Sequence, residues 1–450
     1  MESIIFKRKI YGQMLEWKNK SEGTSALLLK GARRVGKSTI VEEFAKREYH
    51  SYILIDFSNV NEEILELFNH ISDLNFFFLR LQWLTNVTLV QRKSVIVFDE
   101  VQLCPKARQA IKHLVKDGRY DYIETGSLIS IKKNIQNIII PSEERRITMH
   151  PLDFKEFLWA IGKANTFDLI KYSFDNQRPL GDAVNRAILR DFRLYMLIGG
   201  MPQAISKYLS TNNFSEVDQI KRDIIELYLD DFRRIDATGR AATIFTSIPS
   251  ELSRNSMRYK VGSVIQEARP SRMGELFADM SDSLTVAFTH HADDPGVGFA
   301  LHANYDYFKM YIADTGLFVT LAFMDKRYTD NDLYRKLLSD KLPADLGYVY
   351  ENAVAQMLRA SGHSLFYHTF SEKSDTGTAT RRYEIDFLIT RGDKVCPLEV
   401  KSSGYKTHKS LDMFREKYSS RIARPYILYT KDLRNESGIT YLPVYMASLL

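Results

Sequence analysis

The sequence predicts an α/β protein whose first part is a parallel sheet covered by helices. In roughly the first 150 residues, short apolar runs alternate with segments of helical periodicity, as in a sheet buried on both faces. A glycine-rich loop, Gly31–Ser38, stands between the first apolar run and the first long helical segment. Mixed α/β character returns in about the last 105 residues, which predicts a second, smaller α/β region.

The elements of the first part follow from its apolar patterning. The expected strands are Ser25–Lys30, Tyr52–Phe57, Ser94–Phe98 and Tyr122–Thr125. Between them, Lys37–Glu48 and Lys106–Val115 have apolar residues at helical spacing. This alternation is typical of a doubly wound parallel sheet.

The middle of the chain is expected to be mainly helical. Helices in the first portion are interrupted at Gly199–Pro202, and later helices are followed by strand-like runs near Ala241–Phe323. The later pattern suggests a winged-helix-like unit, with Asp293–Gly298 as its exposed turn. The expected domains are 1–150, 151–215 (a helical lid), 216–330 (winged-helix-like) and 345–450.

Composition excludes several classes of protein. The 450 residues are 44% hydrophobic and 26% charged, which is ordinary for a globular chain of more than one domain. No apolar run approaches the ~20 residues that cross a bilayer, so no membrane partner is expected. There is no signal-peptide pattern and only two cysteines, so we expect a cytoplasmic protein without a disulfide framework. His290 and His291 would point to opposite faces of a strand, and we expect them in an exposed loop, not at a metal.

Gly31–Ser38 reads GARRVGKS and satisfies the pattern G-x-x-x-x-G-K-[S/T]. Its glycines let successive backbone N–H groups face phosphate oxygens, and the helix beginning near Lys37 adds its N-terminal dipole. We expect Lys37 to reach the β- and γ-phosphates of a nucleoside triphosphate and Ser38 to bind Mg²⁺. The alternative is a glycine turn before a helix.

Acidic and hydroxyl residues follow the next strands. Asp99 and Glu100 end an apolar strand, where Asp99 would support Mg²⁺ and Glu100 would polarise the attacking water. Two adjacent acids favour hydrolysis over binding alone. Thr125 or Ser127 would sense the γ-phosphate, although an ordinary Gly-Ser turn is the alternative. The residues expected to contact the nucleotide are Gly31, Ala32, Arg33, Arg34, Val35, Gly36, Lys37, Ser38, Thr39, Asp99, Thr125 and Ser127.

Arg145 and Arg146 open the following strand. Either would serve as an arginine finger on a neighbouring protomer, and the sequence does not choose between them. A surface pair of arginines is the alternative interpretation.

The last region predicts a helix and a β-hairpin. The helix is expected at Tyr348–Ala360, and the strands at Tyr383–Thr390 and Val395–Val400, joined by a turn at Arg391–Asp393. Pro397 inside the second strand predicts a sheet edge or a bulge, because proline cannot donate to a strand ladder.

Acidic residues and a lysine gather on this hairpin. Strand alternation puts Glu399 and Lys401 on one face, and the hairpin brings Asp386 beside them. Asp386 and Glu399 would be oxygen ligands for Mg²⁺ or Mn²⁺, and Lys401 would activate a water. Eleven Lys/Arg against six Asp/Glu between Arg381 and Arg424 suit a DNA backbone. The alternatives are a solvated hairpin face and a fold that binds DNA without cutting it.

Several motifs together resemble one family, the prokaryotic AAA-type ATPases that carry a C-terminal domain of unknown function. The motifs are Gly31–Ser38, Val97–Gln102, Thr125–Ser127, Pro151–Phe157 and Gly199–Pro202. The resemblance spans essentially the whole chain. It implies ATP as the nucleotide, an AAA-like core, a helical lid, a winged-helix-like segment and a nuclease-like C-terminal domain. Asp386 with Glu399-x-Lys401 is similar to the PD-(D/E)XK nuclease core, and Glu351 matches the glutamate that such cores often add.

The preferred hypothesis is an ATPase fused to a nuclease-like domain that acts on DNA, whose catalytic residues would be Glu100, Glu351, Asp386, Glu399 and Lys401. Nucleotide state would move the lid near Gly199–Pro202. The first alternative is a nucleotide-switched DNA- or protein-binding regulator without nuclease activity. The second is a scaffold in which ATP stabilises a homo-oligomer or a complex with a partner protein.

Overall fold

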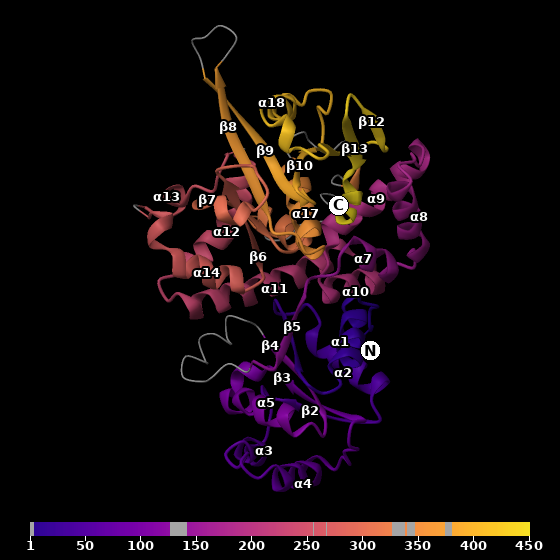
Figure 1. The fold of residues 1–450 in the computed structure, drawn as a ribbon, viewed down its shortest axis with the longest axis vertical. Coiled ribbons are helices and arrows are strands. Elements are labelled where there is room, and N and C mark those ends of the chain that lie inside the picture. The colour runs from indigo at the N-terminus through magenta and orange to yellow at the C-terminus, as the bar shows by residue number, and fades with distance from the viewer. Residues whose placement is uncertain are drawn as a thin grey trace. The chain divides into compact units, whose positions relative to one another are not determined.

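The computed structural model describes residues 4–126, 142–254, 256–266, 268–325, 338–339, 347–373 and 380–450. The chain forms two compact units, Met1–His150 (unit 1) and Pro151–Leu450 (unit 2) (Figure 1). The boundary falls where the alternating pattern of the sequence ends. Among the described residues, no helix combines the length and apolarity that a membrane span requires.

Unit 1 is built on a five-stranded parallel sheet in the order β2-β3-β4-β1-β5. Its strands are β1 (Ala26–Gly31), β2 (Ser51–Asp56), β3 (Ser94–Asp99), β4 (Asp121–Gly126) and β5 (Glu144–Met149). Its helices are α1 (Ile10–Ser21), α2 (Lys37–Glu48), α3 (Glu62–Leu67), α4 (Leu74–Thr85), the short 3-10 helix η1 (Val101–Leu103) and α5 (Pro105–Asp117). The predicted parallel sheet is confirmed, and each of the four predicted strands agrees to about one residue at either end.

Burial explains why these strands read as continuous apolar runs. Leu27, Leu28 and Leu29 of β1 are fully buried, because helices cover both faces of the sheet. Each such side chain contributes roughly 1.5–3 kcal/mol by leaving water. Because all five strands are parallel, their carboxyl ends lie at one edge of the sheet, where α/β proteins bind ligands. Strand β4 lies between β1 and β3, so the residues after these three strands meet there.

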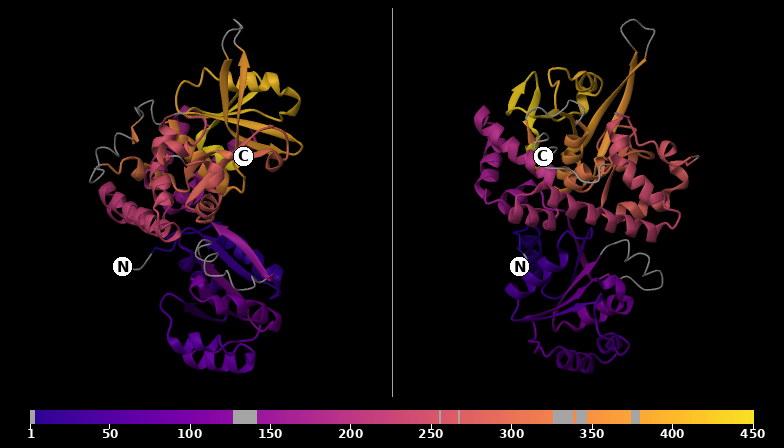
Figure 2. Two further views of the ribbon diagram at one scale, coloured as in Figure 1. Left: turned by 90° about the vertical axis from the view of Figure 1, so that its left-hand side faces the viewer. Right: turned by 180° about the vertical axis from the view of Figure 1, so that it is seen from behind.

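Unit 2 contains an eight-stranded mixed sheet in the order β12-β13-β11-β10-β9-β8-β6-β7 (Figure 2). Its strands are β6 (Val286–Ala292), β7 (Ala303–Ile312), β8 (Phe366–Lys373), β9 (Thr380–Arg391), β10 (Lys394–Lys401), β11 (Tyr426–Tyr429), β12 (Arg434–Glu436) and β13 (Ile439–Pro443). Its helices before the sheet are α7 (Phe154–Ala160), α8 (Ala164–Asp175), α9 (Asp182–Ile198), α10 (Pro202–Thr211), α11 (Phe214–Ile235), α12 (Arg240–Ser253), α13 (Val261–Val264), η2 (Pro270–Arg272) and α14 (Gly274–Asp282). Later helices are η3 (Phe299–His302), α15 (Thr315–Ala322), α17 (Gly347–Ala360), α18 (Lys409–Lys417), η5 (Ser419–Arg421) and η6 (Val444–Leu449).

The three segments that the sequence separates, 151–215, 216–330 and 345–450, lie within this one unit. Strand β6 pairs in parallel with β8, so the sheet runs across the boundary expected near residue 330. Helix α9 is tied to the end of the chain, since the Tyr445 hydroxyl donates to the Asn185 side chain at 2.8 Å. Sequence patterns report local periodicity, whereas these links join residues far apart in the chain.

The region expected to resemble a winged helix places α12, α13 and α14 before the β6–β7 hairpin. Both strands of that hairpin belong to the large sheet. His290 and His291 lie in β6, and His291 is buried, so the expectation of an exposed loop is wrong. The two histidines contact different neighbours, since His290 packs on Tyr305 and His291 on Tyr367.

Pro397 lies in β10, between β9 and β11, so the predicted edge position is wrong. The β9 side pairs regularly, with Pro397 opposite Leu388. On the β11 side, an isolated bridge forms at Val395 and the continuous ladder begins only at Leu398. The Val395 carbonyl accepts from Ala423 on this side, so residue 397 also faces β11. An interior proline is tolerated because its missing N–H falls in the gap of that ladder.

The glycine pair after α9 forms a closely packed turn. Gly199 has a φ of +84°, and a Cβ on Gly200 would lie 2.1 Å from the Leu152 carbonyl oxygen. The Gly200 N–H donates to Asp314 at 2.5 Å. Nearby, the buried Lys221 ammonium donates to the Leu197 carbonyl at 2.7 Å, and burial lowers the pKa of Lys221 to about 8. These contacts hold the turn within unit 2, and a movement near Gly199–Pro202 with nucleotide state stays a prediction.

His368, in β8, makes the stability of unit 2 depend on pH. Its Nδ1 donates to the Ala292 carbonyl at 2.7 Å and its Nε2 accepts from the Tyr418 hydroxyl at 3.2 Å, so the neutral ring satisfies both partners. Burial lowers the pKa of His368 to about 4. Above pH 6.5 the His368 ring is neutral in both the folded and the unfolded chain, so it does not affect stability there. Between pH 6.5 and about 4 the unfolded chain binds it first, which removes up to about 3 kcal/mol of stability.

A His368→Gln variant is therefore expected to lose about 2–3 kcal/mol less stability than the wild type between pH 7 and pH 4.5. The measurement is the free energy of unfolding in urea at both pH values, followed by circular dichroism. Equal losses in the two proteins would contradict the assignment.

Candidate functional site

The Gly31–Ser38 loop is folded as its glycine pattern predicts. Gly36 has a φ of +95° and precedes α2, while Arg34 has a φ of +67°. A Cβ on Gly31 would lie 2.6 Å from the Met149 carbonyl oxygen, so only glycine allows this strand end to approach β5. The loop is braced from outside by Arg8, a residue that the sequence analysis did not single out. Its guanidinium donates to the Val35 carbonyl at 3.0 Å.

Lys37 opens α2 with its ammonium inside the curl of the loop. Its Nζ donates to the carbonyl oxygens of Gly31 at 3.1 Å and Ala32 at 3.0 Å. Burial lowers the pKa of Lys37, although Asp99 and Glu100 favour its charged form. The structure thus provides a buried cation beside two acids at the carboxyl edge of the sheet.

Ser38 and Asp99 meet across this edge. The Ser38 hydroxyl donates to Asp99 Oδ1 at 2.9 Å, although the two residues are 61 positions apart. Thr125, at the end of β4, also donates to that oxygen, and its own hydroxyl accepts the Glu100 N–H at 3.2 Å. Thr125 therefore holds both acids in place, while its contact with a γ-phosphate stays a prediction. Ser127 lies outside the described residues.

Glu100 has a strained backbone. Its φ of +53° is left-handed, which costs a non-glycine residue roughly 1–2 kcal/mol. The buried Gln102 side chain donates to the Glu100 carboxylate. In the sequence, Gln102 stands out only as part of the Val97–Gln102 motif, because its spacing from Glu100 across η1 does not reveal the contact. The strain and the hydrogen bond together direct Glu100 away from the path of a regular strand.

Arg145 and Arg146 lie at the start of β5, opposite the loop-bearing edge of unit 1. Arg146 pairs in register with Leu28 of β1, ahead of the loop, and its Nε is 3.3 Å from Glu144. Both arginines are exposed. Any finger role would require a nucleotide on another protomer, which stays a prediction.

Unit 2 has a second group of polar side chains between α17 and the sheet. Oxygen atoms of Glu351, Glu384 and Asp386 all lie within 4.8 Å of one another. We call these three residues the carboxylate cluster. Glu351 projects from α17 and the other two from β9, and all three are partly buried. Asp386 also accepts the Val400 N–H of β10 at 2.8 Å.

Two residues of β7, Lys309 and Tyr311, contact the carboxylate cluster. Lys309 Nζ lies 3.0 Å from Glu351 and also pairs with Glu384, and the Tyr311 hydroxyl donates to Glu351. Burial disfavours the charged form of Lys309, but Glu351 and Glu384 outweigh it and raise the pKa of this lysine well above its usual value. Burial, followed by the charge of Glu351, raises the pKa of Asp386 well above its usual range.

The grouping differs from the expected Asp386–Glu399 pair. Glu399 is buried outside the carboxylate cluster, with Lys401 Nζ 3.3 Å from its carboxylate. Burial raises the pKa of Glu399, while Lys401 and the Leu411 backbone act in the opposite direction. The alternation itself holds, since Glu399 and Lys401 pair along β10 and Glu384 and Asp386 meet along β9. The difference is that Glu351 and Glu384, and not Glu399, complete the group around Asp386. Glu384 was not predicted as a site residue. It could have been found from its two-residue spacing from Asp386, because residues at this spacing on a strand lie on the same face.

Comparison with protein families assigns the class of unit 1. Residues 23–158 match the model of an AAA domain. With the folded loop and the acids at the sheet edge, this match shows that unit 1 contains an AAA domain and is the P-loop ATPase part of the chain. Residues 189–328 and 346–446 match two domains of unknown function, DUF8612 and DUF4143, whose descriptions name no activity. No curated protein sequence is significantly similar to this chain.

Solved structures with partial likeness include two archaeal proteins. One is the Walker-type ATPase PABY2304 of Pyrococcus abyssi, with 15% identity, a TM-score of 0.42, and 70% of this chain and 96% of that chain covered. The other is the Aeropyrum pernix ORC1 protein in complex with DNA, with 10% identity, a TM-score of 0.27, and 75% and 94% covered. At these TM-scores, neither likeness assigns a function to unit 2.

Proposed function

We propose that this protein hydrolyses ATP with Mg²⁺ in unit 1 and cleaves DNA with a divalent cation in unit 2. The observation that supports the first activity most directly is the hydrogen bond from Ser38 to Asp99 beside a phosphate-binding loop. The second activity rests on the carboxylate cluster, whose oxygens approach within 4.8 Å of one another. DNA as substrate, and assembly as a cytoplasmic homo-oligomer or with a partner protein, are parts of this proposal.

In unit 1, the backbone from Gly31 to Thr39 surrounds the phosphates of ATP. Lys37 exchanges its present carbonyl partners for phosphate oxygens. Ser38 and Asp99 are the oxygen donors suited to Mg²⁺, which neutralises phosphate charge when bound. Glu100 orients the attacking water and accepts its proton.

In unit 2, the donor set fits Mg²⁺ or Mn²⁺, since three carboxylates supply hard oxygen ligands in a partly exposed position. Such an ion lowers the pKa of a bound water and polarises a phosphate when present. Lys401, whose Nζ is 3.3 Å from Glu399 on β10, would stabilise charge on the phosphate. The basic stretch Arg381–Arg424 offers the DNA backbone a favourable field.

A second function is favoured by Lys309. Its ammonium already neutralises Glu351 and Glu384, as a bound cation would. If no ion displaces it, unit 2 is a nucleotide-switched DNA- or protein-binding module without nuclease activity.

One experiment separates these functions. Wild type, Lys37→Ala and Lys401→Ala are incubated with ATP, supercoiled plasmid and Mg²⁺ or Mn²⁺, and phosphate release and nicking are followed together. We expect the wild type to release phosphate and nick DNA. Lys37→Ala should lose phosphate release by about 100-fold or more, since it removes the buried cation from the phosphate site. Lys401→Ala should lose nicking alone.

An Asp386→Ala variant shows whether nicking belongs to this protein, because a contaminating nuclease would survive the substitution. Phosphate release with intact plasmid under every metal and nucleotide condition would reject the nuclease and favour the binding module. Nicking that persists in Asp386→Ala would likewise reject the carboxylate cluster as its source.

A further inference from the structure

Helix α4 is fixed to unit 1 by an apolar face. Phe77, Phe78 and Leu81 are buried in the core of this unit. The Phe77 ring packs edge-on against Phe68 at a centroid distance of 5.5 Å, and the Phe78 ring against Tyr120 at 4.9 Å. These contacts hold the helix in one orientation, so its opposite face is already formed before any partner arrives.

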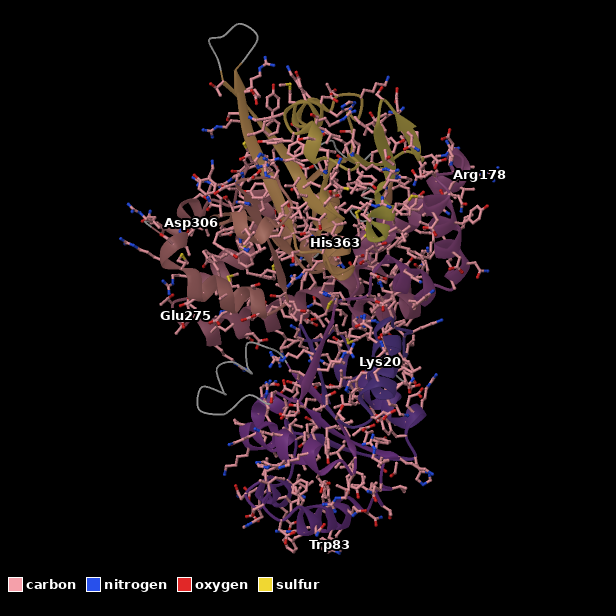
Figure 3. All side chains as sticks on the ribbon, viewed as in Figure 1. Lys20, Trp83, Arg178, Glu275, Asp306 and His363 are labelled. Atoms are coloured by element: carbon pink, nitrogen blue, oxygen red, sulfur yellow. The ribbon has the colours of Figure 1, made fainter. Side chains whose placement is uncertain are left out.

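The opposite face of α4 is apolar too. Phe76, Leu79 and Trp83 have exposed fractions of 50%, 67% and 78%. Their spacing of three and four residues places them in one row along the helix. Trp83 is labelled on the outer surface of unit 1 in Figure 3. We call these three residues the apolar row.

A helix that is apolar on both faces is normally buried on both. Exposed apolar residues that occur singly need no explanation, but the members of the apolar row are neighbours on one helix face. The row also contains tryptophan, a residue type that is enriched at the energetic centres of protein interfaces. The apolar row therefore indicates a surface that another molecule covers.

The charge beside the apolar row is negative. From Asp56 to Leu79 the sequence has five acidic residues and no lysine or arginine. Glu62 and Glu66 lie one turn apart on α3, and both are exposed. Arg80 of α4 lies 4.0 Å from Glu66, which places this face of α3 beside the row. Within the described part of the chain Glu62 forms no ion pair, so its charge is available to a partner.

Negative charge selects among the possible occupants of the apolar row. A second copy of this chain, packed across a twofold axis, would bring the same acids together. Nucleic acid and an anionic membrane surface would also meet like charge. A partner helix with apolar residues at the same three- and four-residue spacing, and with lysine or arginine beside them, matches both the row and its charge.

We propose that the apolar row, together with Glu62, binds a basic amphipathic helix of a partner protein. The apolar side chains of that helix would cover Phe76, Leu79 and Trp83, and its cations would face α3. The inference rests on the part of the proposed function in which this protein assembles with a partner protein, and it names the chemistry of that partner.

The test measures the binding of two fluorescein-labelled peptides to the full chain by anisotropy. The basic probe is LKKLLKLLKKLLKL, which forms an amphipathic helix with lysine on its polar face, and the acidic probe has glutamate in place of each lysine. We expect the basic probe to bind at least about tenfold more tightly than the acidic probe. Phe76→Ser, Leu79→Ser and Trp83→Ser should each weaken its binding about 5- to 30-fold.

Further variants separate the apolar row from other surfaces. Leu169→Ser, at a leucine of 45% exposure on α8, is the matched control and should bind as the wild type does. Glu62→Gln should weaken binding of the basic probe about 1.5- to 5-fold and reduce its salt dependence. Trp83→Phe keeps an aromatic ring and should bind within about threefold of the wild type. The shift of tryptophan emission to shorter wavelength that accompanies binding should disappear in this variant.

No binding of the basic probe by the wild type, or wild-type affinity in all three serine variants, would overturn the inference. Equal affinity for the acidic probe would overturn the choice of a basic partner. A wild-type dimer that Leu79→Ser converts to a monomer, measured by light scattering, would assign the row to a second copy instead. Peptide binding by a wild type that releases no phosphate would reject the proposed ATP hydrolysis and leave this surface standing. Phosphate release without peptide binding would reject the surface alone.

Discussion

The Glu100→Gln variant is expected to hydrolyse ATP about 10²–10⁴-fold more slowly than the wild type, with nucleotide affinity changed by no more than a few-fold. Glutamine keeps the size and hydrogen bonds of the side chain but cannot accept a proton at neutral pH. The Gln102 contact and the Thr125 bond to the Glu100 backbone N–H should hold the new side chain in place. The loss should therefore appear in kcat and leave binding intact.

The measurement is phosphate release under saturating ATP, paired with titration of a fluorescent ATP analogue. Glu63→Gln is the matched control, because it removes one charge from an exposed position on α3 in the same unit. It should behave as the wild type. Turnover in Glu100→Gln at the wild-type rate would show that another group accepts the proton.

The Lys309→Met variant should reduce the free energy of unfolding of unit 2 by about 3–5 kcal/mol in EDTA. Methionine fills the space of the lysine but leaves Glu351 and Glu384 without the cation that neutralises them. The same change should make the carboxylate cluster more avid for Mn²⁺. Mn²⁺ at about 100 times its dissociation constant should restore about 2.7 kcal/mol.

The measurement is urea unfolding with EDTA and with increasing Mn²⁺. Lys221→Met is the matched control, because it removes a second fully buried lysine of unit 2 whose Nζ bonds to the Leu197 and Gly316 carbonyls. It should lose stability without any restoration by Mn²⁺. If Mn²⁺ failed to stabilise Lys309→Met more than Lys221→Met, the carboxylate cluster would not be a cation site.

Local patterns predicted the first unit well. The apolar runs before Gly31 and Asp99 specify two buried strands, and the glycines specify the loop, because these signals depend on neighbouring residues. Once these strands pair in parallel, Ser38 and Asp99 both lie at the carboxyl edge of the sheet and come within hydrogen-bond distance.

The site in unit 2 could be predicted only in part. Asp386 and Lys401 were named from spacing and Glu351 from the resemblance, yet Lys309 lies 42 residues before Glu351 and 75 before Glu384. Its strand is rich in apolar and aromatic residues, so nothing local marks it as part of a charged group. Contacts across such separations depend on the strand order, which periodicity does not specify.

The pairing of β6 with β8 limits where the chain can be truncated. A fragment beginning at residue 346, where the DUF4143 match starts, would lack both β6 and β7. It would expose the edge of β8, which invites aggregation, and would leave the carboxylates of β9 and α17 without Lys309. A fragment that keeps the carboxylate cluster together with Lys309 must therefore begin before β6.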